Sequence, residues 1–227
     1  MAVFAGPEIV DIGLVLCLDA ANKKSYPSTG TTWNDLSTTG VNASLVNGPT
    51  YNSSNLGSIL FDNTNDIVTV NHSSNHLSAN GTIVFWAKPL SDGTSGASRF
   101  ALKGDDTIGA GGYNIAINTD RLYLRVNGGL LSGVLNMANY YNKWSQYTFS
   151  WNSSNQGSIY INTTLDITGS LGATVSMTTT NPLYIGNTDG LSRTFDGNIS
   201  IVQYYNRQLS FAEIQQNFEA IRGRYGI

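Results

Sequence analysis

Carboxylates close together on one strand would indicate glycoside hydrolysis, because that reaction normally uses two carboxyl groups, one of them acting as an acid. The chain has three glutamates, Glu8, Glu213 and Glu219, so residues 9–212 contain none. Its aspartates are not spaced two or four residues apart along a predicted strand. The pattern therefore predicts that the chain is not an enzyme.

Other reactive side chains give no stronger signal. Cys17 is the only cysteine and stands in the apolar run 14–18, which predicts a small buried hydrophobe rather than a reactive thiol. His72 and His76 flank a Ser-Ser-Asn loop. We interpret this loop as a solvated turn, and a metal-binding histidine pair is the alternative. No nucleophile-elbow sequence supports a Ser-His-Asp triad.

Calcium is the cofactor for which the sequence offers candidate ligands. Ca²⁺ prefers carboxylate, amide and carbonyl oxygens. Loop aspartates that could meet at one rim are Asp62, Asp66, Asp105, Asp106 and Asp189. The alternative is that these side chains only stabilise turns through hydrogen bonds to the backbone.

Glycan binding needs exposed aromatic rings with amides and hydroxyls nearby. The candidate ligand-binding residues are Trp33, Tyr113, Tyr140 and Tyr141. The remaining tryptophans, Trp86, Trp144 and Trp151, occur in strand patterns, and we expect them in the core.

The composition narrows the classes of partner. The 227 residues carry a net charge of −3, and only 12% are charged, so a nucleic-acid partner, which requires a clustered basic face, is not expected. No apolar run approaches the length of a transmembrane helix, so we expect no membrane insertion. The N-terminus lacks the basic and apolar regions of a signal peptide.

Short apolar or alternating runs, separated by Gly, Asn, Asp and Pro, fill most of the chain. Residues 113–117 and 122–126 are joined by Asn-Thr-Asp-Arg, which predicts a hairpin. Residues 144–151 alternate, placing Tyr147 and Phe149 on the same face. Many short strands at this spacing predict an all-β antiparallel sandwich.

A helix is predicted over residues 210–222. Ser210 is its expected N-cap, and Glu213 three residues later completes a capping box. The apolar stripe of this helix is Ile214, Phe218 and Ile221. We expect the stripe to be buried against the sandwich, with Phe218 as its largest member.

Several segments share the pattern of one family. They include Leu-Val-Leu-Cys-Leu-Asp at residues 14–19 and Phe-Trp-Ala-Lys at residues 85–88. The most specific are Phe-Asp-Gly-Asn-Ile at residues 195–199 and Tyr-Asn-Arg-Gln-Leu-Ser at residues 205–210. In these segments the chain resembles the laminin-G-like domains of tailed-phage virion proteins. One departure is Ser200, which stands where those domains usually carry an acidic pair.

The resemblance covers nearly the whole chain and implies its fold class. That class is a two-sheet antiparallel jelly-roll sandwich, concanavalin A-like or laminin-G-like, with one short C-terminal α-helix. It also implies a single domain over residues 11–227, including the helix over 210–222, preceded by an N-terminal arm over residues 1–10.

For function, the resemblance implies a non-catalytic virion surface protein of a tailed phage. Such a protein is either a capsid decoration protein or a tail-associated adhesin, and it binds glycans or the host surface. The expected partners are other virion proteins or further copies of the chain, with the arm as the contact. The alternatives are a lectin-like carbohydrate-binding module and a glycoside-active enzyme.

Overall fold

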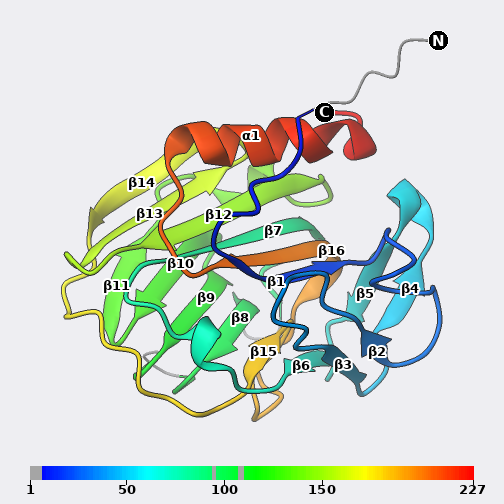
Figure 1. Ribbon diagram of the computed structural model, residues 1–227, viewed down its shortest axis with the longest axis horizontal. Helices are drawn as coiled ribbons and strands as arrows, with labels where there is room; N and C mark the ends of the chain where they lie inside the picture. Colours follow the sequence, from blue (N-terminus) through cyan, green and yellow to red (C-terminus); the bar gives the residue numbers. More distant parts are fainter. Residues whose placement is uncertain (1–6, 94–95, 107–109) are drawn as a thin grey trace.

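Two antiparallel sheets pack face to face in the computed structural model, which describes residues 7–93, 96–106 and 110–227 (Figure 1). Sheet A contains, in spatial order, β14 (Thr164–Ser170), β13 (Gln156–Ile161), β12 (Ser145–Trp151), β7 (Gly81–Pro89), β16 (Asp196–Tyr205), β5 (Ser58–Asp62) and β4 (Thr50–Asn52), and β1 (Leu14–Asp19) also pairs with β16. Sheet B contains β11 (Gly129–Ser132), β10 (Arg121–Val126), β9 (Tyr113–Asn118), β8 (Ala97–Lys103), β15 (Leu183–Ile185), β6 (Ile67–Val70), β3 (Ala43–Val46) and β2 (Thr32–Trp33). The predicted all-β, two-sheet jelly-roll fold is confirmed.

The core lies between the two sheets, and strand alternation decides which side chains enter it. In β9, Tyr113, Ile115 and Ile117 point into the core, so Asn114 and Ala116 lie on the outer face of sheet B. In β7, Ile83, Phe85 and Ala87 point inward, which puts Val84 and Trp86 on the outer face of sheet A. Each sheet therefore has an outer face that must meet either water or another part of the chain.

The outer face of sheet A is covered by α1 (Phe211–Ile221) and the 3-10 turn η5 (Arg222–Tyr225) (Figure 1). The expected capping box is present, because the Ser210 hydroxyl accepts from the Glu213 N–H and a Glu213 oxygen accepts from the Ser210 N–H. Ile214 and Ile221 are buried, as predicted. The helix thus covers the outer face of sheet A, and only residues 206–210 connect it to β16.

Phe218 differs from the prediction, because it is only partly buried. Phe218 and Tyr225 together cover the Trp86 ring, and Tyr225 was not part of the apolar stripe predicted from the sequence. The Trp86 ring centroid lies 4.6 Å from that of Tyr225 and 5.7 Å from that of Phe218, and both pairs are stacked. With two rings on it, Trp86 is fully buried although it faces outward.

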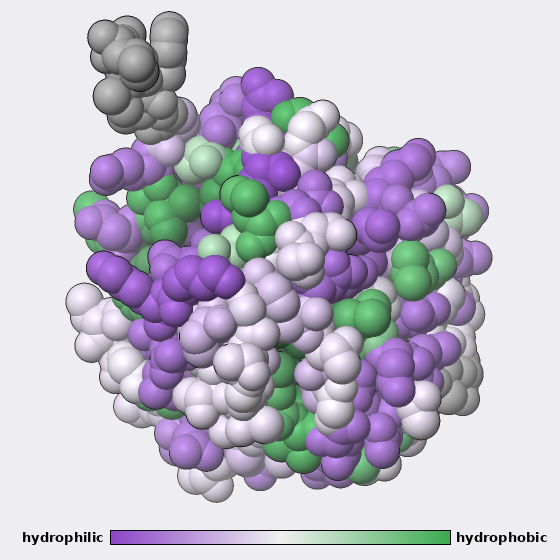
Figure 2. Space-filling model, turned by 90° about the vertical axis from the view of Figure 1, so that its right-hand side faces the viewer, coloured by the Kyte–Doolittle hydropathy of each residue, from purple (hydrophilic) through white to green (hydrophobic). Residues whose placement is uncertain are grey.

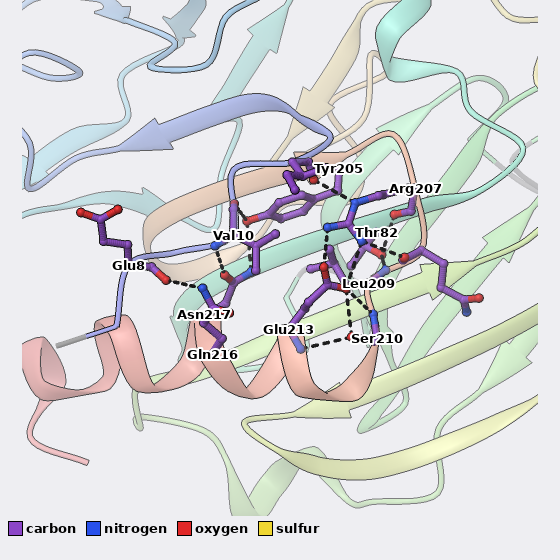
Figure 3. A network of polar contacts seen from close by, with 12 residues as sticks. Glu8, Val10, Thr82, Tyr205, Arg207, Leu209, Ser210, Glu213, Gln216 and Asn217 are labelled. Atoms are coloured by element: carbon purple, nitrogen blue, oxygen red, sulfur yellow. Dashed lines mark hydrogen bonds and ion pairs between the residues drawn. The ribbon is translucent and has the colours of Figure 1, made fainter.

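The N-terminal segment is tied to the helix by a buried polar network (Figure 3). The Asn217 side chain accepts from the Val10 N–H at 2.8 Å and donates to the Tyr205 hydroxyl at 3.0 Å, and this hydroxyl donates to the Val10 carbonyl at 2.9 Å. Of the arm predicted over residues 1–10, residues 1–6 lie outside the described residues. Residues 8–10 lie against α1, so this part of the arm packs on its own chain.

The surface is largely polar and uncharged. Figure 2 shows hydrophobic residues on one face as small separate groups among hydrophilic and neutral ones. No helix in the described part of the chain is both long enough and apolar enough to cross a membrane.

We predict that Asn217→Ala lowers the free energy of unfolding by about 1–3 kcal/mol, because it leaves the buried Val10 N–H without a partner. The measurement is urea denaturation followed by circular dichroism. The control is Gln216→Ala, which removes only an exposed hydrogen bond to the Glu8 carbonyl and should change stability little. Equal effects of the two substitutions would contradict the proposed role of Asn217.

Candidate functional site

Two of the predicted aromatic ligands are core residues. Trp33 and Tyr113 are both fully buried, and Tyr113 packs against Trp151 and Tyr204 at ring-centroid distances of 5.2 and 5.8 Å. Both side chains stand on inward-facing strand positions, so a sugar has no access to their rings. Alternation shows that such residues share a face, but not that this face is the inner one.

Tyr140 and Tyr141 follow the 3-10 turn η4 (Met137–Asn139) and are both partly buried. The Tyr141 hydroxyl donates to Asp120 at 2.7 Å, which holds its ring against the loop. Tyr140 lines a groove of about 420 Å³ together with Trp144 and Tyr225. Trp144 was expected in the core, but it precedes β12 and stays partly exposed.

Two aromatic rings of this groove, those of Trp144 and Tyr225, are already stacked on each other. The Trp144 ring lies 4.6 Å from that of Tyr225, and the other stacking partner of Tyr225 is Trp86 at 4.6 Å. The Trp144 indole N–H donates to Asn55 at 3.0 Å. These contacts hold the C-terminal turn on sheet A, so we interpret the groove as part of that closure.

Of the aspartates considered for calcium, Asp62 and Asp66 share one turn, whereas Asp106 and Asp189 lie in other places. The Asp62 carboxylate accepts from the Thr64 N–H, and the Asp66 carboxylate accepts from the Asp62 N–H, so both stabilise one turn. Burial raises the pKa of Asp66 to about 6, which opposes the charged form that a cation would need. Asp189 is exposed and accepts from the Gly190 N–H. Within residues 7–93, 96–106 and 110–227, no three His, Cys, Asp or Glu side chains come together to hold a metal.

A polar hollow of about 170 Å³ lies on the outer face of sheet B. It is lined by Arg99, Asp106, Asn114, Ala116, Asn118, Tyr123, Arg125 and Arg193. Asp106 was among the candidate calcium ligands, whereas the other seven residues were not identified as site residues. Asp105, its neighbour, is exposed and does not line the hollow.

Strand register explains why a hollow forms here. Ala116 in β9 is directly opposite Arg99 in β8 and Tyr123 in β10, so a methyl group stands between two large side chains. Two positions further along the same strands, and therefore on the same face, Asn114 is opposite Arg125. Directly opposed residues have Cβ atoms about 4.5–5.5 Å apart, so these side chains surround a common space above Ala116.

Asp106 holds Arg99 in a fixed position. Its Oδ1 atom accepts from Nε and Nη2 of Arg99 at 3.2 and 3.1 Å, and its carbonyl accepts from the Asn114 amide at 2.7 Å. The Arg99 side chain is only 7% exposed. Burial lowers the pKa of Arg99, Asp106 opposes this shift, and the nearby Arg193 and Arg125 add to it.

Arg193 reaches the hollow from the loop between β15 and β16. The backbone N–H of Arg99 donates to the backbone carbonyl of Arg193 at 3.1 Å, and this hydrogen bond fixes the loop along β8. Within the described residues, the side chains of Arg125 and Arg193 form no ion pair or hydrogen bond with another side chain. As far as the described residues go, the hollow therefore combines two guanidinium groups that lack a side-chain partner with amides and one aromatic ring.

Part of the hollow could have been found from the sequence. The predicted hairpin over residues 113–117 and 122–126 places Tyr123 and Arg125 on the face opposite Leu122 and Leu124. No local pattern brings Arg99 or Arg193 to the same place, because they enter from β8 and from a distant loop.

Sequence comparison identifies one family model. The model of the concanavalin A-like lectin/glucanases superfamily matches residues 62–215, a range that includes every residue lining the hollow. No curated protein matches the chain.

Several solved structures share the fold. The binding domain of Paraclostridial Mosquitocidal Protein 1 is 17% identical with a TM-score of 0.71, over 91% of this chain and 52% of that chain. The botulinum neurotoxin serotype G binding domain is 17% identical with a TM-score of 0.70, over 90% and 50%. The botulinum neurotoxin serotype D ligand binding domain, solved in complex with N-acetylneuraminic acid, is 17% identical with a TM-score of 0.69, over 91% and 50%. This chain thus spans about half the length of these structures, and the likeness concerns the fold.

We predict that Asp106→Asn lowers the free energy of unfolding by about 1–3 kcal/mol, because Arg99 is left nearly buried without its carboxylate. Urea denaturation measures the change. The control is Asp189→Asn, an exposed aspartate in a neighbouring loop, which should have little effect. If Asp106→Asn is as stable as the unmodified chain, the pair does not hold Arg99 in place.

Proposed function

We propose that this chain, which belongs to the concanavalin A-like lectin/glucanases superfamily, is a non-catalytic domain that binds a saccharide in the hollow on sheet B. The observation that carries the proposal is the convergence of amides, guanidinium groups and the Tyr123 ring around Ala116. In ligand-binding pockets a few precisely placed polar groups fix the orientation of the ligand, and here such groups converge on one concave surface.

The chemistry of the hollow suits a sugar ring. Sugar hydroxyls both donate and accept hydrogen bonds, and the side-chain amide of Asn118 does the same. Asn114 is buried and donates to the Asp106 carbonyl, so it supports the wall of the hollow. Tyr123 is partly exposed and presents an aromatic ring beside these amides. The volume of about 170 Å³ is below that of a typical drug-sized pocket, so we propose that it holds one ring of a longer saccharide.

The carboxylate content of the hollow supports binding rather than hydrolysis. Asp106 is the one carboxylate among the lining residues, and it is bonded to Arg99. Glycosidases normally need two carboxyl groups flanking the bond that is cleaved. A domain of similar fold, from botulinum neurotoxin serotype D, was solved with N-acetylneuraminic acid, which supports a saccharide as the ligand class.

For the biological setting, we propose the surface of a tailed-phage particle, as a decoration protein or tail-associated adhesin docked to other virion proteins or to further copies of the chain. The support is the sequence pattern at residues 195–199 and 205–210. Peptide mass spectrometry of purified particles should then detect this chain in a fixed ratio to the capsid protein. A chain missing from the particles, together with saccharide binding, would favour a free lectin-like module.

We predict that a glycan array detects binding by the full chain and that Ala116→Leu abolishes it, because the larger side chain fills the floor of the hollow. Tyr123→Ala should weaken binding by removing the aromatic ring. The matched control is Thr69→Leu, which adds a similar side chain to the outer face of sheet B on β6.

Thermal melting should be similar for Ala116→Leu and Thr69→Leu, so that loss of binding is not loss of fold. Retained binding in a folded Ala116→Leu protein would place the saccharide elsewhere and refute the proposed site.

A further inference from the structure

The electrostatics of the hollow suggest which saccharides it takes. Three guanidinium groups, from Arg99, Arg125 and Arg193, meet there, and Asp106 neutralises one of them. The hollow is therefore positive although the whole chain has a net charge of −3. Like charges at short range disfavour one another, and a bound anion relieves that repulsion.

The two unneutralised arginines are placed to act together. Arg125 projects from β10, and Arg193 comes from the loop that is bonded to β8 at Arg99. Both side chains are partly buried, so their charges are less screened than those of fully exposed residues. Arg99, Arg125 and Arg193 line the same hollow, so the three groups are close in space.

Guanidinium groups favour a planar or tetrahedral oxyanion. Their fixed N–H donors match the oxygens of a carboxylate or a sulfate, and such charge-assisted hydrogen bonds are stronger than neutral ones. Arg99 is already positioned by Asp106, and within the described residues its Nη1 atom has no hydrogen-bond partner. The hollow can thus surround an anionic group on more than one side.

We infer that the hollow binds a saccharide through an anionic group on the sugar ring, a carboxylate or a sulfate ester, held by Arg125 and Arg193. This inference rests on the proposed saccharide site and names its ligand class. The Asn118 amide and the Tyr123 ring contact the rest of the sugar. A neutral sugar would leave the two guanidinium groups without a counter-charge.

The test is isothermal titration calorimetry of the full chain with oligogalacturonate, a sulfated galactan oligosaccharide, a neutral galactan oligosaccharide and inorganic sulfate. Oligogalacturonate carries carboxylates and the sulfated galactan carries sulfate esters, so these two ligands distinguish the two possible anionic groups. We expect at least one of these two to bind about tenfold or more tightly than the neutral oligosaccharide, with affinity falling as salt rises. Inorganic sulfate should bind far more weakly, because it lacks the sugar ring.

Arg125→Gln and Arg193→Gln should each weaken binding of the anionic oligosaccharide by about tenfold or more. The matched control is Arg121→Gln, which removes the same charge from the outer face of β10 outside the hollow and should leave the affinity unchanged. Unchanged melting temperatures in all three variants would show that folding is intact.

The outcomes separate this inference from the proposed function. One outcome would overturn the inference and leave the saccharide site standing. In it, neutral and anionic oligosaccharides bind equally tightly and Arg125→Gln and Arg193→Gln have no effect on affinity, whereas Ala116→Leu loses binding. Inorganic sulfate that binds as tightly as the oligosaccharide would overturn the saccharide part. If no oligosaccharide shows binding that Ala116→Leu removes, both the saccharide site and the inference about its anionic ligand are refuted.

Discussion

The burial of Trp86 on the outer face of sheet A is the contact on which the rest of the architecture depends. A large aromatic side chain cannot stay exposed there without cost, and two stacked rings from the C-terminal helix and turn cover it. Asn217 then links the same helix to Val10, so the two ends of the described chain meet over sheet A. These contacts assign the outer face of sheet A to stability, whereas the polar hollow lies on the outer face of sheet B.

The outer face of sheet B carries the polar hollow because side chains alternate between the two faces of each strand. Apolar side chains of β9 and β10 fill the core, and the outward positions are therefore polar or small. Ala116 provides space between Arg99 and Tyr123, and the neighbouring Asn114 and Arg125 give that space its chemistry. One small residue, Ala116, thus leaves a polar hollow between the larger side chains of β8, β9 and β10.

Local patterns were sufficient for the fold but not for the site. The capping box at Ser210 and Glu213 and the alternation of β12 depend on neighbouring residues, so the sequence predicts them correctly. Tyr113 shows the limit, because alternation cannot say which face of a strand is the inner one. Phe218 shows another, since Tyr225 lies beyond the predicted stripe. The meeting of Arg99 with Arg193 depends on strand order and a distant loop, which no local pattern contains.

The central claim is that covering sheet A leaves sheet B as the binding face. An NMR titration of the isotope-labelled chain with oligogalacturonate tests it most directly. We predict chemical-shift changes centred on β8, β9 and β10 around Ala116, with the signals of α1 unchanged. Shift changes centred on Trp144 and Tyr225, in the aromatic groove beside the helix, would contradict it.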